Sequence, residues 1–448
     1  NREILRNSIF FPSFEVPTEK SIDLAVSRTF PAIHWNISDS SVREKKATTS
    51  KPGLKRISIP AAVGILTALI AIILVFRPFN RGKPVHLSTE PFALLTAGDN
   101  ESAGKLHREE GGTVEPTGDG KRSVSLVESW KKSFRQPVTS SPVFYKGTIF
   151  FGCRDSTMYA FTKDGRLKWK HFSGNGIGAS PCCVSGRVIG ANYSGDVFCL
   201  DDEDGSEVWS FNAKAKIVST PRAWKNLVLI GTMDGNLIAL DLEDGKRLWS
   251  EKIGSAIWAS VSIGDECIIA ATTDCSLIKL DQGGKIIWRV KPGGGILSSP
   301  LCLETKNLIV FGTKDRYIYA YSLEKGNLMW RYATEGEMNG PPASDGKYIF
   351  AGSEDGKLYT LTLNGRLVWE SDLGGSVLSR PLIIGETVFV TTYSNKLSGL
   401  KKDTGKIVGE YRTGSPVYSS PSHDGERIFF GSNGGIFYAV RLYNEDSE

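Results

Sequence analysis

Residues 226–249 read Asn-Leu-Val-Leu-Ile-Gly-Thr-Met-Asp-Gly-Asn-Leu-Ile-Ala-Leu-Asp-Leu-Glu-Asp-Gly-Lys-Arg-Leu-Trp, and this stretch decides the fold. Asp-Gly pairs, typical of tight turns, follow two apolar runs of strand length and end at Gly235 and Gly245. The strand after the second turn contains Trp249, and the segment around Pro221 supplies one more strand. The stretch therefore predicts one four-stranded antiparallel sheet.

The same pattern recurs eight times along the chain. Seven units carry a Trp and the eighth a Gly, spaced by 39 to 42 residues: Trp130, Trp169, Trp209, Trp249, Trp288, Trp330, Trp369 and Gly409. Twelve residues after each comes a proline in seven cases and a valine in one: Pro142, Pro181, Pro221, Val261, Pro300, Pro342, Pro381 and Pro421. A repeat of this length, with short strands in each unit, is the signature of a β-propeller. We therefore predict an all-β, eight-bladed propeller.

The ends of the repeat region predict how the ring closes. The eighth unit ends near residue 442 without a final strand of the Trp type, whereas residues 123–130 supply one before the first Ser-Pro unit. We expect residues 123–130 to complete the last blade, so that the propeller spans residues 123–442. Such closure removes an exposed sheet edge.

The units resemble the PQQ-like (quinoprotein-type) propeller repeat. The resemblance rests on Tyr-Ala-Phe-Thr-Lys-Asp-Gly-Arg-Leu-Lys-Trp169, Leu-Asp-Leu-Glu-Asp-Gly-Lys-Arg-Leu-Trp249 and Tyr-Ala-Tyr-Ser-Leu-Glu-Lys-Gly-Asn-Leu-Met-Trp330. It implies that each repeated Trp docks structurally against the neighbouring blade. Gly409 departs from the pattern, so the junction it serves is expected to be looser or to be filled by another residue, with Tyr411 as the candidate.

The resemblance implies a function in protein recognition, because the repeat is similar to that of the outer-membrane assembly factor BamB. We expect an extracytoplasmic scaffold or adaptor that binds other proteins and whose propeller is a monomer. Exposed aromatic residues and Arg are enriched at binding hot spots. The candidate contacts are therefore Trp224 and Trp258, the two propeller Trp outside the repeat register, and Arg316 and Tyr317, which replace the usual turn residues of the fifth unit. Packing between blades is the alternative interpretation for each.

Two other functions stay open at this point. A quinoprotein dehydrogenase would need PQQ and Ca²⁺, and the adjacent pair Cys182 and Cys183 resembles a vicinal disulfide that contacts the cofactor in some of these enzymes. The competing interpretation is that one Cys faces the core and the other the neighbouring sheet. Because units of 39 to 42 residues leave little chain for an active-site cap, we expect no enzyme, cofactor or metal. The second alternative is the sensor of a membrane-spanning signalling protein, such as a Ser/Thr kinase with its catalytic domain upstream.

Residues 57–76 predict a transmembrane helix. These 20 residues, Ile-Ser-Ile-Pro-Ala-Ala-Val-Gly-Ile-Leu-Thr-Ala-Leu-Ile-Ala-Ile-Ile-Leu-Val-Phe, contain no charge, and their length matches a bilayer span. Lys and Arg are denser before the segment than after it, which places the N-terminus in the cytoplasm and the propeller in the periplasm or at the cell surface. Residues 1–56 are expected to form a mostly disordered cytoplasmic tail. The polar, Gly-rich residues 77–122 are expected to form a flexible linker.

Charge and cysteine content argue against other classes of function. The formal charge is +5, of which residues 1–56 carry +4, so the predicted propeller is nearly neutral. Nucleic-acid binding needs a concentrated basic surface and is not expected. The seven cysteines include no Cys-x-x-Cys pair, so a zinc site is not expected either.

Overall fold

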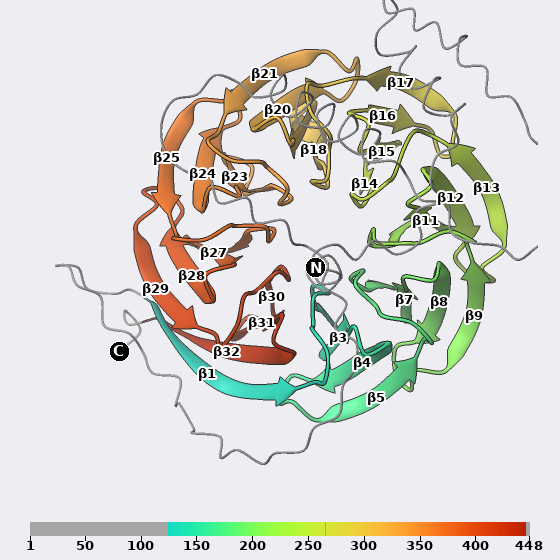
Figure 1. Cartoon of the computed structure of the whole chain (residues 1–448), viewed down its shortest axis with the longest axis horizontal. Helices are drawn as coiled ribbons and strands as arrows, with labels where there is room; N and C mark the ends of the chain where they lie inside the picture. Colours follow the sequence, from blue (N-terminus) through green and yellow to red (C-terminus); the bar gives the residue numbers. More distant parts are fainter. Residues whose placement is uncertain (1–123, 265, 445–448) are drawn as a thin grey trace, which may run out of the picture. The chain divides into compact units, whose positions relative to one another are not determined.

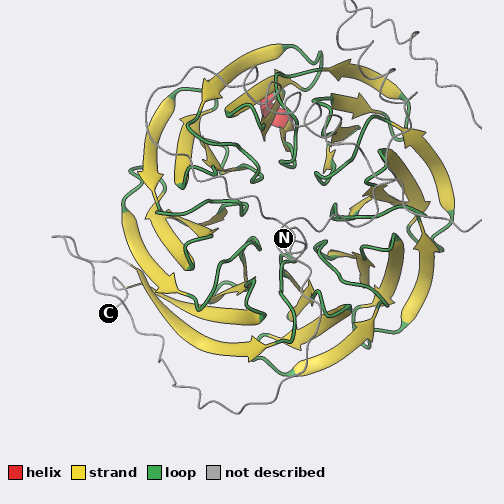
Figure 2. Ribbon diagram, in the orientation of Figure 1, coloured by secondary structure: helices red, strands yellow, loops and turns green. Residues whose placement is uncertain are grey.

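In the computed structural model, the described residues, 124–264 and 266–444, form eight four-stranded antiparallel sheets arranged as blades around a ring (Figures 1 and 2). The prediction of an all-β, eight-bladed propeller is confirmed. Within these residues the helical content is a single 3₁₀ turn, η1 (Glu304–Lys306), between two strands of the fifth blade.

Blades 1 to 4 follow one another along the chain, each with its innermost strand first. Blade 1 is β2 (Val143–Tyr145), β3 (Thr148–Gly152), β4 (Thr157–Thr162) and β5 (Leu167–Phe172); blade 2 is β6 (Cys182–Val184), β7 (Arg187–Ala191), β8 (Asp196–Asp201) and β9 (Glu207–Asn212). Blade 3 is β10 (Arg222–Trp224), β11 (Leu227–Gly231), β12 (Asn236–Asp241) and β13 (Arg247–Lys252); blade 4 is β14 (Ser262–Ile263), β15 (Ile268–Ala271), β16 (Leu277–Leu280) and β17 (Ile286–Val290).

Blades 5 to 7 repeat this order, and blade 8 draws its fourth strand from the other end of the repeat region. Blade 5 is β18 (Leu301–Leu303), β19 (Leu308–Gly312), β20 (Tyr317–Ser322) and β21 (Leu328–Ala333); blade 6 is β22 (Ala343–Ser344), β23 (Tyr348–Gly352), β24 (Lys357–Thr362) and β25 (Leu367–Asp372). Blade 7 is β26 (Leu382–Ile384), β27 (Thr387–Thr392), β28 (Lys396–Lys401) and β29 (Ile407–Arg412); blade 8 is β30 (Ser422–His423), β31 (Arg427–Gly431), β32 (Ile436–Asn444) and β1 (Val124–Ser133).

The strand β1 closes the ring, because it is the outer strand of a sheet whose other three strands come from the end of the repeat region (Figure 1). It pairs antiparallel with β32 over the whole length of both strands, from Val124 opposite Asn444 to Ser133 opposite Ile436. Both strands are longer than their counterparts in the other blades. The closed ring therefore has no open edge between blade 8 and blade 1.

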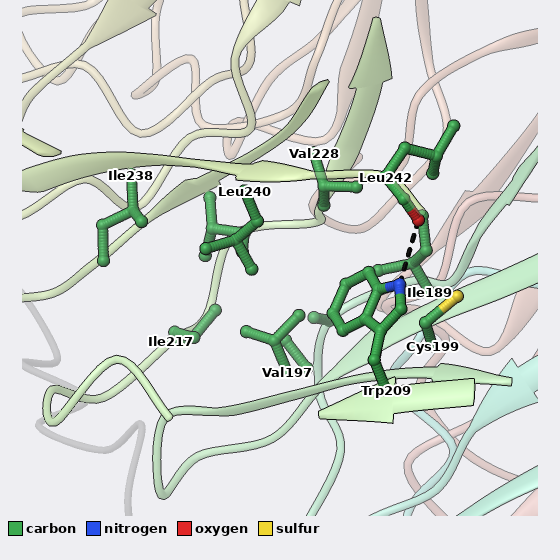
Figure 3. Close-up of a cluster of buried hydrophobic side chains, with 12 residues drawn as sticks. Ile189, Val197, Cys199, Trp209, Ile217, Val228, Ile238, Leu240 and Leu242 are labelled. Carbon is green, nitrogen blue, oxygen red and sulfur yellow. Dashed lines mark hydrogen bonds between the residues drawn. The ribbon is translucent and has the colours of Figure 1, made fainter. Parts of the chain in front are cut away.

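Hydrophobic clusters between neighbouring blades hold the ring together. In the cluster shared by blades 2 and 3, the ring of Trp209 lies close to Cys199 and below Val228 and Leu242 (Figure 3). The Nε1 of Trp209 donates a hydrogen bond of 2.9 Å to the backbone oxygen of Leu242 in the next blade. A large aromatic ring buried at such a junction removes roughly 150–250 Å² of surface from water.

All seven repeated Trp make this contact with the following blade. Each indole Nε1 donates to a backbone oxygen at 2.9–3.3 Å, with the pairs Trp130–Lys163, Trp169–Asp202, Trp209–Leu242, Trp249–Gln282, Trp288–Leu323, Trp330–Leu363 and Trp369–Lys402. The accepting residue lies in or beside the turn that follows the third strand of the next blade, and a glycine with positive φ in that turn packs on the indole. An added Cβ would lie 2.5–3.0 Å from the indole at each of these glycines: Gly165, Gly205, Gly245, Gly284, Gly326, Gly365 and Gly405.

The eighth junction differs because β1 occupies the space. At Gly409 an added Cβ would lie 2.7 Å from the backbone oxygen of Val124, so a Trp has no room there. Val408 and Tyr411 of β29 instead pack with Leu126 of β1 in one buried cluster. Gly409 is thus accounted for by the closing strand, which lies where the other blades have a turn.

The predicted tail (1–56), transmembrane helix (57–76) and linker (77–122) lie outside the described residues. Among residues 124–264 and 266–444, no helix is both long and apolar enough to span a bilayer.

Candidate functional site

One face of the ring is built from the turns between the second and third strands of the blades and from the linkers that lead into the inner strands. In every blade a turn residue donates its backbone N–H to a linker oxygen at 2.9–3.1 Å. The turn residues, in blade order, are Arg154, Tyr193, Met233, Thr273, Lys314, Glu354, Tyr393 and Asn433. We call these turns and linkers the hairpin face. Its backbone repeats eight times, so only its side chains distinguish one blade from another.

Four aromatic side chains stand on the hairpin face. Tyr193 and Tyr393 come from turns, whereas Trp258 and Tyr418 occupy equivalent linker positions, three residues before Val261 and Pro421. Tyr393 and Tyr418 are 45% and 43% exposed, whereas most aromatic rings of the described residues are buried within or between the blades.

Three of these rings are electrostatically coupled. The pKa of Tyr418 is raised, first because the surrounding chain desolvates its hydroxyl and then through Tyr193 and Tyr393. The side-chain amide of Asn433 donates a hydrogen bond of 3.2 Å to the hydroxyl of Tyr393. The tyrosines from blades 2, 7 and 8 therefore belong to one region of the face.

Positive charge accompanies the aromatic rings. The Nζ of Lys216 lies 5.0 Å from the centre of the Tyr193 ring, and the guanidinium of Arg154 lies 5.9 Å from it. Cations at this distance are attracted by the negative face of an aromatic ring. The arrangement offers flat apolar surface together with hydrogen-bond donors, which is the composition of a protein-binding surface.

The residues proposed from the sequence do not converge on one site. Trp258 lies on the hairpin face and is partly buried. Trp224, at the end of β10, is only 9% exposed and packs in the core between blades 3 and 4, with Lys225 over its ring at 4.9 Å. For Trp224 the packing interpretation holds, because its strand directs the ring into a blade junction.

Arg316 and Tyr317 lie in a turn of blade 5. Arg316 is exposed and adopts a positive φ of 67°, and its backbone oxygen accepts two hydrogen bonds from Thr334. Tyr317 is partly buried at the start of β20, with the guanidinium of Arg331 4.9 Å from its ring centre. The described contacts of Arg316 lie in blade 5, whereas Tyr317 also packs against the hydrophobic cluster between blades 4 and 5. No described contact joins either residue to Trp258.

Tyr193, Tyr393 and Tyr418 were missed by the sequence analysis, although a signal was present. Tyr193 and Tyr393 occupy the same position in their repeats, and an alignment of units on the proline would have placed both on one face. The repeated Trp residues are conspicuous because they recur in seven units. The tyrosines occur in only one or two units, and they distinguish those blades from the others.

Cys182 and Cys183 are the residues through which this ring would contact PQQ, with Ca²⁺ beside it. Both are free thiols, and they point to opposite sides of β6: Cys182 packs on the cluster with blade 3, and Cys183 on the cluster with blade 1. Burial raises the pKa of both thiols. Among the described residues no group of three or more His, Cys, Asp or Glu is placed to hold a metal ion. These residues do not fit the cofactor and its metal.

Comparison with known families gives one result that covers most of the propeller. The family described as outer membrane protein assembly factor BamB matches residues 173–256, 253–340 and 314–444, which is more than half of the chain.

Two curated relatives match over shorter stretches. BamB of Shewanella oneidensis is 27% identical over 142 residues, which are 28% of this chain and 35% of that protein. Tetrathionate hydrolase of Acidithiobacillus ferrooxidans is 27% identical over 118 residues, 20% of this chain and 24% of that protein. The chain thus spans about a third or less of the length of these curated relatives.

Two solved structures share the architecture. BamB from Moraxella catarrhalis superposes with a TM-score of 0.63 at 14% identity, over 70% of this chain and 99% of that one. Quinohemoprotein alcohol dehydrogenase from Comamonas testosteroni superposes with a TM-score of 0.59 at 14% identity, over 71% of this chain and 76% of that one. At this identity the likeness concerns the fold alone.

Proposed function

This chain belongs to the family of the outer membrane protein assembly factor BamB, and from that premise we propose that its propeller is a protein-binding scaffold. The observation that carries the proposal is the group of tyrosines on the hairpin face, formed by Tyr193, Tyr393 and Tyr418. Exposed rings on a rigid frame bind a partner at a small cost in conformational entropy, because each ring has only two side-chain torsions to fix.

The charges beside these rings support a protein as the partner. Lys216 and Arg154 accompany Tyr193, whereas Glu354 in blade 6 interacts electrostatically with Tyr418. Both signs of charge around an aromatic centre favour a polar protein surface over a uniformly charged polymer such as nucleic acid. The partner is therefore proposed to be another protein.

We place this scaffold outside the cytoplasm and attach it to a membrane through residues 57–76. Support for the location comes from the BamB relatives, whose name places them in outer-membrane protein assembly. Support for the attachment comes from the 20 uncharged residues of the segment. The linker of residues 77–122 would let the propeller reach partners at some distance from the membrane.

A cross-linking experiment with full-length protein in its native membrane tests the scaffold. A photo-reactive amino acid at residue 418 should trap a defined partner, identified by mass spectrometry, and Tyr393→Ala should abolish the cross-link. Tyr443→Ala is the matched control, because Tyr443 is similarly exposed (48%) but lies on β32, away from the turns and linkers. An equal yield of the same partner from wild type and Tyr393→Ala would contradict a role for the hairpin face.

A further inference from the structure

A belt of hydrogen bonds runs between the inner strands, formed by the residue before each blade's proline position. The backbone N–H of one blade donates to the side-chain hydroxyl of the next: Ser141 to Ser180, Ser180 to Thr220, Thr220 to Ser260, Ser260 to Ser299, Arg380 to Ser420 and Ser420 to Ser141, at 2.8–3.3 Å. The six bonds join the segments that lead into the innermost strands of neighbouring blades.

Blade 6 interrupts this belt and frees one position in blade 7. In blade 6 the residue before the proline position is Pro341. Proline has no backbone N–H to donate and no side-chain hydroxyl that could accept a hydrogen bond. A hydroxyl at position 380 would therefore have no N–H from blade 6 to accept. Position 380 is thus released from the requirement for Ser or Thr, and it holds Arg380.

A second arginine stands near the middle of the ring on the opposite side. Arg222 begins β10, the innermost strand of blade 3, and Arg380 lies two residues before β26, the innermost strand of blade 7. Both are the only charged residues at their repeat positions. The equivalents of Arg222 are Val143, Cys182, Ser262, Leu301, Ala343, Leu382 and Ser422.

The positive charge of Arg222 acts on Arg380, and no carboxylate among the described residues forms an ion pair with either arginine. Burial lowers the pKa of Arg380 to about 10, and the charge of Arg222 adds to the effect. The Nε of Arg222 is buried and has no hydrogen-bond partner within the described part of the chain.

We propose that Arg222 and Arg380 form a binding site for a small oxyanion, a carboxylate or a phosphate, near the middle of the ring. A guanidinium presents parallel N–H donors that match two oxygens of such a group, and charge-assisted hydrogen bonds are the stronger kind. An anion between the two side chains replaces their repulsion by two attractions.

Titration of the purified full chain with two probes, inorganic phosphate and succinate, tests this site. Sodium chloride at equal ionic strength serves as the reference, and the readouts are the melting temperature and the dissociation constant from calorimetry. At least one probe should bind wild type and raise its melting temperature. Arg222→Gln and Arg380→Gln should each weaken binding about tenfold or more, which corresponds to the loss of a hydrogen bond to a charged group. Arg412→Gln, at the exposed end of the outer strand β29, should leave binding unchanged.

Arg380→Ser keeps the test decisive if a Gln variant fails to fold, because Ser stands at this position in five other blades. Binding of phosphate alone or of succinate alone, lost in Arg380→Ser, supports the site and names the class of oxyanion. Absence of binding by both probes overturns the proposal. So does equal binding by wild type and the folded arginine variants. These readouts do not depend on a protein partner, so the proposed scaffold function stands or falls separately.

Discussion

The hydroxyl of Tyr411 in β29 donates a hydrogen bond of 2.5 Å to the carboxylate of Glu128 in β1, across 283 residues of sequence. This contact joins blade 7 to the closing strand of blade 8, at the one junction that lacks a Trp. Tyr411 is only 9% exposed, and Glu128 is also held by Lys131 at 3.3 Å. The junction is therefore fastened by a polar contact where the others use an indole.

Tyr411→Phe should destabilise the folded protein by about 1.5 kcal/mol, because it removes a hydrogen bond to a charged acceptor. Burial, then Glu128, raise the pKa of Tyr411 above the value of ~10 expected for an unfolded chain. The stabilisation is fully present below that pH and decreases as pH rises towards the folded pKa. Chemical denaturation of wild type and Tyr411→Phe at pH 7 and pH 11 measures the difference in their free energies of unfolding. A difference that is larger at pH 11 than at pH 7 would contradict the stabilising role of this hydrogen bond.

Gly365→Ala should destabilise the protein more than Gly374→Ala does. The two glycines have nearly the same φ, 76° and 74°, so both substitutions incur a left-handed backbone penalty of about 1–2 kcal/mol. A Cβ at 365 would lie 2.5 Å from the Trp330 ring, whereas a Cβ at 374 has no heavy atom within 4 Å. The extra cost at 365 should be about 1–3 kcal/mol, as for overpacked cores. Equal melting temperatures of the two variants would show that the ring contact carries no weight.

Gly409→Trp, which restores the repeat residue, should weaken the ring instead of strengthening it. The side chain would have to displace the backbone of β1 at Val124, and unpairing of that strand opens blade 8. We expect a lower melting temperature and faster proteolysis near residue 124 than in wild type. Trp369→Gly, which removes a repeat Trp that is only 8% exposed, is the reciprocal variant and should cost about 3–5 kcal/mol. A gain in stability for Gly409→Trp would refute the explanation given for this glycine.

The buried thiols should be unreactive in the native protein. Burial raises the pKa of Cys153 and of Cys199 to about 12, and the thiolate is the reactive form. At pH 8 a thiol reagent should therefore modify these two residues only after denaturation, as shown by peptide mapping. An intact mass that is unchanged by reduction would confirm that Cys182 and Cys183 are free thiols, and a mass increase on reduction would reveal a disulfide.

Removal of residues 57–76 should release the protein from membranes. Full-length chain is expected in the pellet after an alkaline carbonate wash, because a transmembrane helix resists this treatment, whereas the deletion variant should be soluble. The control removes an equal length of the predicted linker, residues 95–114, and should stay in the pellet. Recovery of the full-length chain in the soluble fraction would contradict the span.

Much of the fold could be predicted because each unit repeats the same turn signals, so a weak pattern is seen eight times. The position of the Trp224 ring could not be predicted. The repeat pattern identifies the Trp residues that pack at blade junctions, but it does not say in which direction a Trp outside the pattern points. Strand β10 directs that ring into the junction with blade 4. The reason why residue 409 is a glycine could not be predicted either, because it depends on the backbone of β1, which lies far away in the sequence.

The candidate sites were harder to predict than the fold, because each joins residues from blades that are not adjacent in sequence. Tyr193 and Tyr418 come from blades 2 and 8, and Arg222 and Arg380 from blades 3 and 7. Only the closed ring brings such residues together. The sequence shows that each of these positions departs from the repeat. Which of these residues interact with one another could be seen only in the structure.

The pairing of β1 with β32 also determines when folding can be completed during synthesis. The first strand of the ring leaves the ribosome some 300 residues before its partner, which at roughly 5–20 residues per second is a delay of roughly 15–60 s. During that time seven blades can assemble, while β1 keeps an unsatisfied edge that any extended chain can join. The nascent protein is therefore most open to misassembly before translation of its last strand, and the same pairing that completes the ring ends that period.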